Sequence, residues 1–456
     1  MSRRSGTPLV VWAVLFAATC GCGGDGGVRA PSPTVAGIAF APPAPVFVDE
    51  VDDVEPQIAG DGDGAWIAVW ERETPIDGAA LLHDVVAARS AGGGVRWDAP
   101  VGLSGGFVGF TPRLAGDRHA DLVVVWEDRP GGDLAAARTL DGGITWETRF
   151  PVNAPGTRSN FDEVPGDYEV ATDRAGTWIV VFTLDGTLGN SLVVAAASHD
   201  VGRTWEAPIA LHAGASSDFQ PTIAADGRGG WVIVWTSTDP LANLGGRSDG
   251  VGLLAVHSGD GGRTWSTPSA IVAPAEASLG DAEPQVATDG AGTWHVAWIA
   301  TRDDGDVGLR SEVRATRSSD LGGTWTTPRV LSNSALSTAN LRPRIGTDTT
   351  GRVVALWSTT SAANRAQIVL AQSADQGGTW TEPAPFPGGE VDYRRDGFPM
   401  LGLATDDRGA WRVAWSRSHG DAGPIDAPAH DVVVSAGAPS AAQSSGLAGR
   451  LVSPIR

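Results

Sequence analysis

The sequence predicts an all-β protein that folds as a seven-bladed propeller of four-stranded antiparallel blades. Three observations lead to this prediction: a hairpin motif present seven times, a second motif that follows most copies, and an N-terminal segment that matches the one strand missing at the end. The 456 residues include 61 Gly and 30 Pro, and no long stretch has the periodicity of a helix. This composition is typical of many short strands joined by turns.

The first motif reads Pro-x-apolar-small-x-Asp, followed by a Gly-containing turn and an apolar strand that usually ends in Trp. Its clearest copy spans Pro284–Trp298. Two short apolar stretches around a turn predict a β-hairpin, and the Asp recurs about every 57 residues. The aspartates of the seven copies are Asp61, Asp117, Asp173, Asp226, Asp289, Asp348 and Asp406.

The second motif follows a third apolar strand and reads Ser/Thr-x-Asp-x-Gly-x-Thr-Trp. Asp and Ser/Thr side chains can hydrogen-bond the backbone of their own turn, Gly permits positive φ, and Trp can fill the space between units. We therefore expect a folded bend rather than a ligand site. The motif residues are Asp141, Asp200, Asp260, Asp320 and Asp375 with Trp146, Trp205, Trp265, Trp325 and Trp380. A degenerate copy at Ser90–Trp97 lacks the Asp.

Each unit thus contributes four strands, but one fourth strand is missing. Seven first hairpins and seven third strands are present, whereas only six fourth strands follow a Trp motif. The segment Phe40–Val48 precedes the first hairpin and matches the Pro-containing fourth strand that follows Trp265. We expect this N-terminal strand to complete the last blade and remove an exposed sheet edge. The alternative is six blades with a loose extra hairpin.

The second motif resembles the Asp-box, or bacterial neuraminidase repeat (BNR), of the sialidase-like propeller families. The resemblance covers residues 38–435 and implies a propeller fold. In those families the Asp-boxes lie away from the active site. Sialidases proper have six blades, so the seven units depart from the enzyme family. The family's Phe/Tyr-Arg-Ile-Pro signature is missing near the start; Pro343–Gly346 matches it in part but lies in the sixth unit.

Long, irregular loops are expected on the face where the first strands start, here called the top face, and binding usually resides in such loops. They are 71–83, 149–166, 236–250, 299–311, 386–397 and 416–430. The first candidate function is a non-catalytic binding or interaction module. It would act as a monomer whose top face takes an unknown glycan or protein.

The second candidate function is an exo-acting glycoside hydrolase resembling sialidases (exo-α-sialidase). The resemblance implies three arginines that clamp a carboxylate, a Tyr nucleophile with a Glu partner, and an Asp as acid and base. The candidates are Arg113, Arg344, Arg394, Tyr393, Glu390 and Asp53, with Arg342, Arg395, Glu55, Asp167 and Glu283 nearby. All 18 Trp belong to the leader, the second strands and the boxes. None is left to stack on a sugar, which weakens both glycan interpretations.

The N-terminus predicts export. Arg3 and Arg4 precede an apolar run at 9–18, shorter than the roughly 20 residues that a membrane-spanning helix needs. The segment resembles a bacterial lipoprotein signal in which Cys22, or else Cys20, is lipidated; ordinary secretion is the alternative. We expect a signal peptide at 1–21, a flexible tether at 22–36 and one propeller domain at 37–456. The location would be the cell envelope, as an outer-membrane lipoprotein whose only membrane contact is the lipid anchor.

Charge and spacing exclude several other sites. The net charge of −20 argues against a nucleic-acid partner, because binding phosphates needs a basic surface. The histidines lack metal-ligand spacing, and His83 and His430, which recur at one repeat position, are interpreted as a shared strand-start feature. The acidic runs at 49–53 and 303–306 lack the spacing of a calcium loop. The sequence therefore predicts no metal and no cofactor.

Overall fold

The computed structural model describes residues 37–49, 51–76, 81–129, 133–153, 167–186, 190–214, 216–242, 250–272, 279–303, 309–333, 339–360, 366–391, 399–406, 409–418 and 430–440. The expected signal peptide, both cysteines and the tether lie outside these residues. All regular structure within them is β. In this part of the chain, no helix is long and apolar enough to cross a membrane.

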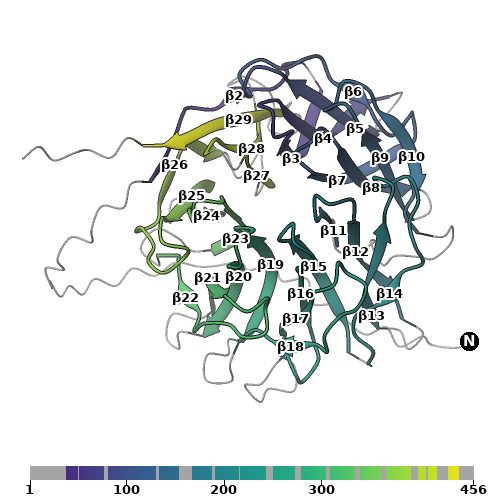
Figure 1. Cartoon of the computed structure of the whole chain (residues 1–456). Coiled ribbons are helices and arrows are strands. Elements are labelled where there is room, and N and C mark those ends of the chain that lie inside the picture. Colours follow the sequence, from purple (N-terminus) through teal and green to yellow (C-terminus); the bar gives the residue numbers. More distant parts are fainter. Residues whose placement is uncertain are drawn as a thin grey trace, which may run out of the picture. The chain divides into compact units, whose positions relative to one another are not determined.

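Seven antiparallel sheets surround a central channel as the blades of a propeller (Figure 1). Six blades are made of four consecutive strands, and the first strand of each lies innermost, at the channel wall. These blades are β3 (Asp52–Gly60), β4 (Trp66–Pro75), β5 (Leu81–Ser90), β6 (Val101–Gly102); β7 (Val108–Gly116), β8 (Leu122–Arg129), β9 (Asp133–Thr139), β10 (Glu147–Pro151); β11 (Tyr168–Thr172), β12 (Trp178–Asp185), β13 (Ser191–Ser198), β14 (Ile209–Ala210); β15 (Asp218–Ala225), β16 (Trp231–Ser237), β17 (Gly252–Ser258), β18 (Ser269–Ala270); β19 (Gly280–Thr288), β20 (Trp294–Asp303), β21 (Leu309–Ser318), β22 (Arg329–Val330); and β23 (Ala339–Thr347), β24 (Val353–Thr360), β25 (Ala366–Ser373), β26 (Ala384–Val391). The predicted seven-bladed fold is confirmed.

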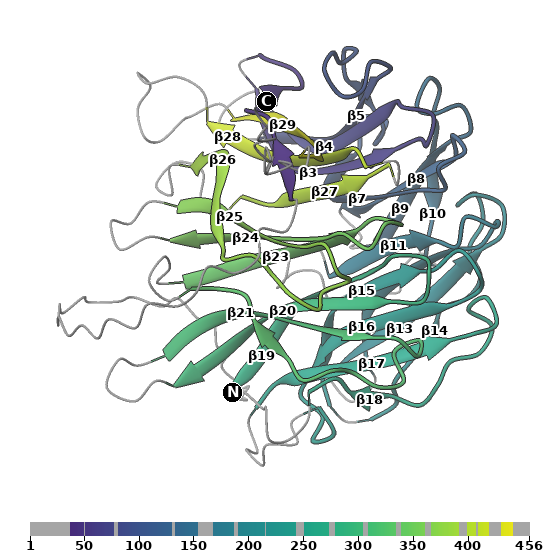
Figure 2. The ribbon, with the colours of Figure 1, turned by 60° about the vertical axis from the view of Figure 1, so that its left-hand side comes forward.

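The seventh blade joins the two ends of the described chain. It consists of β27 (Leu401–Thr405), β28 (Trp411–Ser418) and β29 (His430–Pro439), with β1 (Ile38–Phe40) and β2 (Ala44–Pro45) from the N-terminal segment. Both short strands pair antiparallel with β29, so the purple and yellow ends of the chain lie side by side in Figures 1 and 2. The predicted closure by the N-terminal strand is confirmed.

The motif aspartate stabilises the turn of each first hairpin in the same way. In all seven hairpins, Oδ1 of the motif Asp accepts a hydrogen bond from the backbone N–H four residues later, at 2.8 to 3.1 Å. In the six hairpins whose turns are fully described, Oδ1 also accepts the N–H two residues later. One side chain thus holds a turn that would otherwise leave two amides without partners.

The Asp-boxes are folded bends, as the sequence predicts. In the fourth blade, Asp260 accepts hydrogen bonds from the Thr264 amide at 2.9 Å, the Thr264 hydroxyl at 2.6 Å and the Ser258 hydroxyl at 2.8 Å. These bonds from Thr264 hold the pKa of Asp260 at about 2. The box tryptophans pack against the apolar clusters between adjacent blades. The boxes are therefore occupied by their own structural contacts.

The core is divided among the seven junctions between blades. Each junction holds one apolar cluster of described residues, in which tryptophans of the second strands are fully buried. Between the third and fourth blades, for example, Trp231 and Trp235 pack against Ile179 and Val181. The faces of each blade thus pack against the neighbouring blades.

The loops of the top face are shorter than the sequence suggests. Residues 71–75 and 81–83 belong to β4 and β5, and residues 299–303 and 309–311 belong to β20 and β21. Residues 386–391 belong to β26. Antiparallel strands continue beyond the apolar core because their backbone hydrogen bonds do not require apolar side chains. A polar sequence in this fold therefore does not mark the end of a strand.

We expect closure of the seventh blade by β1 and β2 to stabilise the propeller and to prevent its self-association. A chain starting at residue 47 would expose the edge of β29, whereas a control chain starting at residue 37 keeps both strands. The shorter chain should unfold at a lower temperature and self-associate through the open edge. Circular dichroism melts and light scattering measure both effects. Equal unfolding midpoints and the same oligomeric state for the two chains would contradict this role.

Candidate functional site

Bulges in the inner strands shape the top end of the channel. In five blades the register between first and second strands shifts at a residue followed by Pro. Proline is tolerated there because a bulge requires no ladder hydrogen bond from its nitrogen. The residues before these prolines have φ between 48° and 54°, and they are Glu55, Thr111, Gln220, Glu283 and Arg342.

The amide that the bulge releases from the ladder is bound by the preceding blade. The Glu283 N–H donates to Oε1 of Gln220 at 2.9 Å, and the Arg342 N–H donates to Oε2 of Glu283 at 2.6 Å. The Gln220 N–H in turn donates to Oδ1 of Asp167. In the third, fourth and fifth blades, the side chain at this repeat position supports the bulge of the next blade.

Glu55 occupies the same repeat position but lacks this structural contact. The bulge amide of the next blade, the Thr111 N–H, donates instead to Oε2 of Glu71 on β4, at 3.0 Å. Oε2 of Glu55 is buried and has no hydrogen-bond partner among the described residues. A buried carboxylate oxygen without a partner is costly, and such groups are often reserved for a ligand or for proton transfer.

The charges of three arginines act on this carboxyl group. Burial raises the pKa of Glu55 to about 7, and the opposing charges of Arg113, Arg342 and Arg344 do not cancel the effect. Burial also lowers the pKa of Arg344, to about 10, so its guanidinium remains charged at neutral pH. We call Glu55, Arg113, Arg342 and Arg344 the channel-mouth cluster.

Other contacts fix the orientation of two of these arginines. Nε of Arg344 donates to the Leu401 carbonyl of the seventh blade at 2.7 Å. Nε of Arg113 lies 3.9 Å from Oε2 of Glu169, and its guanidinium lies 5.6 Å from the ring centre of Tyr168. The cluster therefore combines side chains of the first, second and sixth blades held by neighbours in the third and seventh.

The structure brings some of the candidates named from the sequence together and places others elsewhere. Arg113 and Arg344 lie in the channel-mouth cluster. Asp53 is buried and accepts two hydrogen bonds from Arg72, at 2.9 and 3.1 Å. Glu390 is exposed on β26, the outermost strand of the sixth blade. Tyr393, Arg394 and Arg395 lie outside the described residues.

Tyr168 is an interior hydrogen-bonding residue. Its hydroxyl lies 2.8 Å from the Thr111 hydroxyl and accepts the Glu127 N–H at 3.1 Å. The side chain is 1% exposed, and burial raises the pKa of its phenol. These contacts join the second and third blades, and they leave Tyr168 unsuited to act as a nucleophile.

One group of described residues has the geometry for a metal ion. Ligand atoms of Glu71, Glu73 and His83 lie within 4.8 Å of one another. Both oxygens of Glu71 already accept hydrogen bonds, one from Thr111 and one shared with Nδ1 of His83 at 2.7 Å. The equivalent His430 bonds Asp52 at 3.0 Å. Both histidines therefore bind a carboxylate of an inner strand or its neighbour, and these contacts explain them without an ion.

The role of Glu55 was not recognised from the sequence, although its charge was noted. The signal lies in the repeat register: Glu55 stands six residues before the motif Asp, as Gln220 and Glu283 do. Only the contact of Glu71 with the Thr111 amide distinguishes it from them. That contact depends on the packing of two blades and has no sequence pattern.

Comparisons with known proteins agree with this architecture. Residues 171–394 match the BNR repeat-like domain family. No curated protein matches the chain in sequence. An ulvan lyase of polysaccharide lyase family PL25 has a similar structure, with a TM-score of 0.53 and 13% identity, over 86% of this chain and 95% of that chain.

Two further structures are more distant. A protein of unknown function from Dyadobacter fermentans has a TM-score of 0.49 and 12% identity, over 89% of this chain and 100% of that chain. A Hadza microbial sialidase has a TM-score of 0.42 and 17% identity, over 84% of this chain and 65% of that chain. The chain is a seven-bladed β-propeller, and close to half of it is similar to the BNR repeat-like domain family.

Proposed function

We propose that the channel-mouth cluster binds an acidic carbohydrate. The observation that carries this proposal is the set of three arginines whose charges act on the Glu55 carboxyl group, one oxygen of which is buried. A guanidinium group binds a carboxylate or sulfate through two parallel hydrogen bonds, so converging arginines favour an anionic sugar over a neutral one. The export expected from the N-terminal residues would expose this site to extracellular glycans.

The fold comparison supports the same ligand class. A second structure of the PL25 ulvan lyase, with the same TM-score of 0.53, is described as bound to -[GlcA(1-4)Rha3S]-. That ligand carries both carboxylate and sulfate groups. At 13% identity the likeness concerns the fold, and the arginines of this chain supply the independent argument.

Glycoside hydrolysis is a second candidate, favoured by the pKa of Glu55. A carboxyl group with a pKa of about 7 is half protonated at neutral pH and can give its proton to a glycosidic oxygen. In the sialidase-like alternative, Tyr393 would attack the sugar and the arginines would hold its carboxylate. The binding module requires the arginines alone, whereas the hydrolase requires Glu55 as well.

We expect loss of either guanidinium from this cluster to weaken binding of acidic sugars. The probes are 3′-sialyllactose and tetragalacturonate, with lactose as the neutral control. Arg113→Gln and Arg344→Gln should each reduce affinity for at least one acidic probe by roughly tenfold, because each removes a charge-assisted hydrogen bond. Arg302→Gln, which removes a half-exposed arginine of β20, should leave it unchanged. Equal binding of lactose, or equal losses in all three variants, would refute the proposal.

The raised pKa of Glu55 predicts a pH-dependent effect on stability. The folded state holds the proton more tightly than the unfolded state, so the charged carboxylate costs folding free energy as pH rises from about 4.5 to 7. Glu55→Gln should therefore stabilise the chain relative to wild type by about 3 kcal/mol at pH 8 and have little effect at pH 4. Urea unfolding at the two pH values measures this. A difference independent of pH would show that Glu55 titrates normally.

Hydrolysis of a fluorogenic sialoside separates the two candidate functions. If the chain is a hydrolase, Glu55→Gln and Tyr393→Phe should each lower kcat by roughly a hundredfold or more. Sialyllactose binding should be retained in both variants. No turnover by wild type, together with arginine-dependent binding, would identify a binding module.

A further inference from the structure

Two arginines at the opposite end of the channel occupy an unusual backbone position. In three hairpins, the residue after the motif Asp is Gly62, Gly227 or Gly290, with φ between 66° and 81°. Arg118 and Arg174 stand at the same position in the second and third blades, with φ of 68° and 56°. A side chain in this conformation costs about 1 kcal/mol that glycine avoids. Such a cost at two neighbouring turns points to a use for both side chains.

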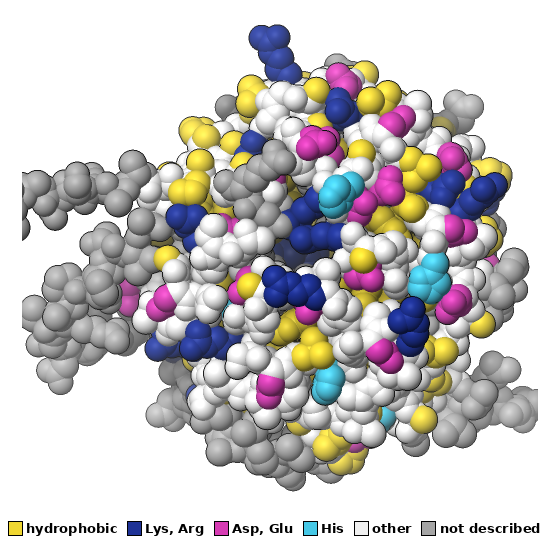
Figure 3. Space-filling view, viewed as in Figure 1, with side chains coloured by type: hydrophobic (Ala, Val, Ile, Leu, Met, Phe, Trp, Pro, Cys, Tyr) yellow, Lys and Arg dark blue, Asp and Glu magenta, His cyan; other side chains and the backbone are white. Residues whose placement is uncertain are grey.

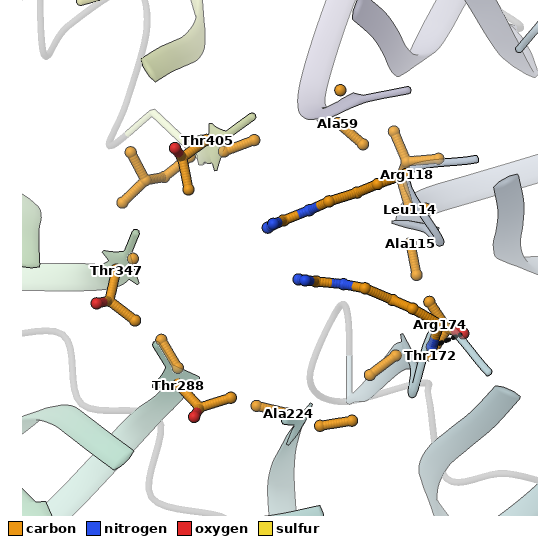
Figure 4. Close-up of a pocket in the computed structure, with 18 of the residues that line it drawn as sticks. Ala59, Leu114, Ala115, Arg118, Thr172, Arg174, Ala224, Thr288, Thr347 and Thr405 are labelled. Atoms are coloured by element: carbon orange, nitrogen blue, oxygen red, sulfur yellow. Dashed lines mark hydrogen bonds between the residues drawn. The ribbon is translucent and has the colours of Figure 1, made fainter. Parts of the chain in front are cut away.

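Both side chains enter one cavity at the turn end of the channel. Figure 4 shows Arg118 and Arg174 extending side by side from their turns into the open space. The cavity has a volume of about 280 Å³. Its lining includes the small residues of the hairpin motif, among them Ala59, Ala115 and Ala224, together with threonines and larger apolar side chains. Figure 3 shows basic side chains gathered at the central hollow of one face of the ring.

The electrostatics of the cavity favour an anion. Burial, together with the nearby charge of Arg174, lowers the pKa of Arg118 to about 9. Burial likewise lowers the pKa of Arg174. Both remain charged at neutral pH, so two cations share a partly buried space. The carboxylates of Asp406 and Asp117 act on them, but each also accepts a turn amide through Oδ1.

The arginines are the natural donors to a ligand in this cavity. The hydroxyls of Thr172 and Thr288 point along the wall and donate to carbonyls of their own turns, at 3.0 and 2.9 Å. The alanine side chains of the wall offer no hydrogen bonds, and the cavity is large enough for a small oxyanion with its hydrating waters. Two guanidinium groups from one side match the oxygens of a tetrahedral anion.

We propose that Arg118 and Arg174 form a second binding site, which takes a small oxyanion such as phosphate or sulfate. The ligand is either the free ion or the ester group of a larger molecule that reaches the cavity from the turn face. This site is separate from the channel-mouth cluster because the ring of small residues, two positions before the motif Asp, lies between them. It is therefore independent of the proposed carbohydrate binding.

Substitution by glycine gives a test in which the backbone is preserved. Arg118→Gly and Arg174→Gly introduce the residue that equivalent turns already carry, so the variants should fold and their turns should lose strain. Titrations use inorganic phosphate, inorganic sulfate and glucose 6-phosphate, with chloride at matched ionic strength. Isothermal calorimetry and thermal unfolding measure binding. Arg228→Gly, which removes an exposed arginine from the neighbouring hairpin turn, is the matched control.

Wild type and Arg228→Gly should bind phosphate or sulfate and gain thermal stability beyond the chloride control. Each single glycine variant should bind at least tenfold more weakly, and the double variant should show no anion-dependent shift. Binding of glucose 6-phosphate as well would support the site and indicate an ester ligand; binding of the inorganic ions alone would support it as a free-ion site. Arg344→Gln should leave phosphate binding unchanged, which separates this site from the channel-mouth cluster. Absence of an anion effect in wild type, or its retention in the double variant, would overturn the proposal.

Discussion

The packing of the blades around the channel depends on one group, the backbone N–H at each inner-strand bulge. The bulge takes this N–H out of the hydrogen bonds of its own sheet. Seven strands converge around one channel, and a buried N–H without a partner would cost as much as a lost hydrogen bond. Neighbouring blades satisfy this requirement for one another, as Gln220 does for Glu283 and Glu283 for Arg342. The blades are consequently joined at the channel by polar contacts and farther out by apolar clusters.

A departure from this regular arrangement creates the candidate site. Glu71 reaches from the second strand of its blade to the Thr111 amide and leaves Glu55 without its structural role. The same repeat position that stabilises three blade junctions thus presents an acidic group with a pKa of about 7 in the first blade. A functional site in a repeat protein can arise in this way, because a residue in one repeat can lose a structural contact that the equivalent residues in other repeats keep.

The two ends of the channel differ in the kind of constraint on their arginines. At the top end, Arg113 and Arg344 extend from strands, and neighbouring blades orient them. At the turn end, Arg118 and Arg174 extend from tight turns whose backbone favours glycine. Along the inner strands, the small residues two positions before the motif Asp lie between these two groups of arginines, in a chain of net charge −20.

Local chemistry determined the features that could be predicted from the sequence. The turn aspartates such as Asp226, the boxes such as Asp260 and the closing strand at Phe40 all depend on contacts within a few residues or on strand pairing that the repeat itself reveals. The extent of the hairpins was not predictable, because residues 71–75 continue a ladder whose polar side chains resemble a loop.

The sequence by itself determined the number of blades and the turns, because a local pattern repeated seven times encodes them, and the ring closure, because one N-terminal segment matches the missing fourth strand. It also showed that arginines stand near the starts of the inner strands. Only the tertiary structure decided that the charges of Arg113, Arg342 and Arg344 act on Glu55. It likewise decided that Arg118 and Arg174 share a cavity. These arrangements join residues of different blades, and the distances between blades are set by packing around the whole ring.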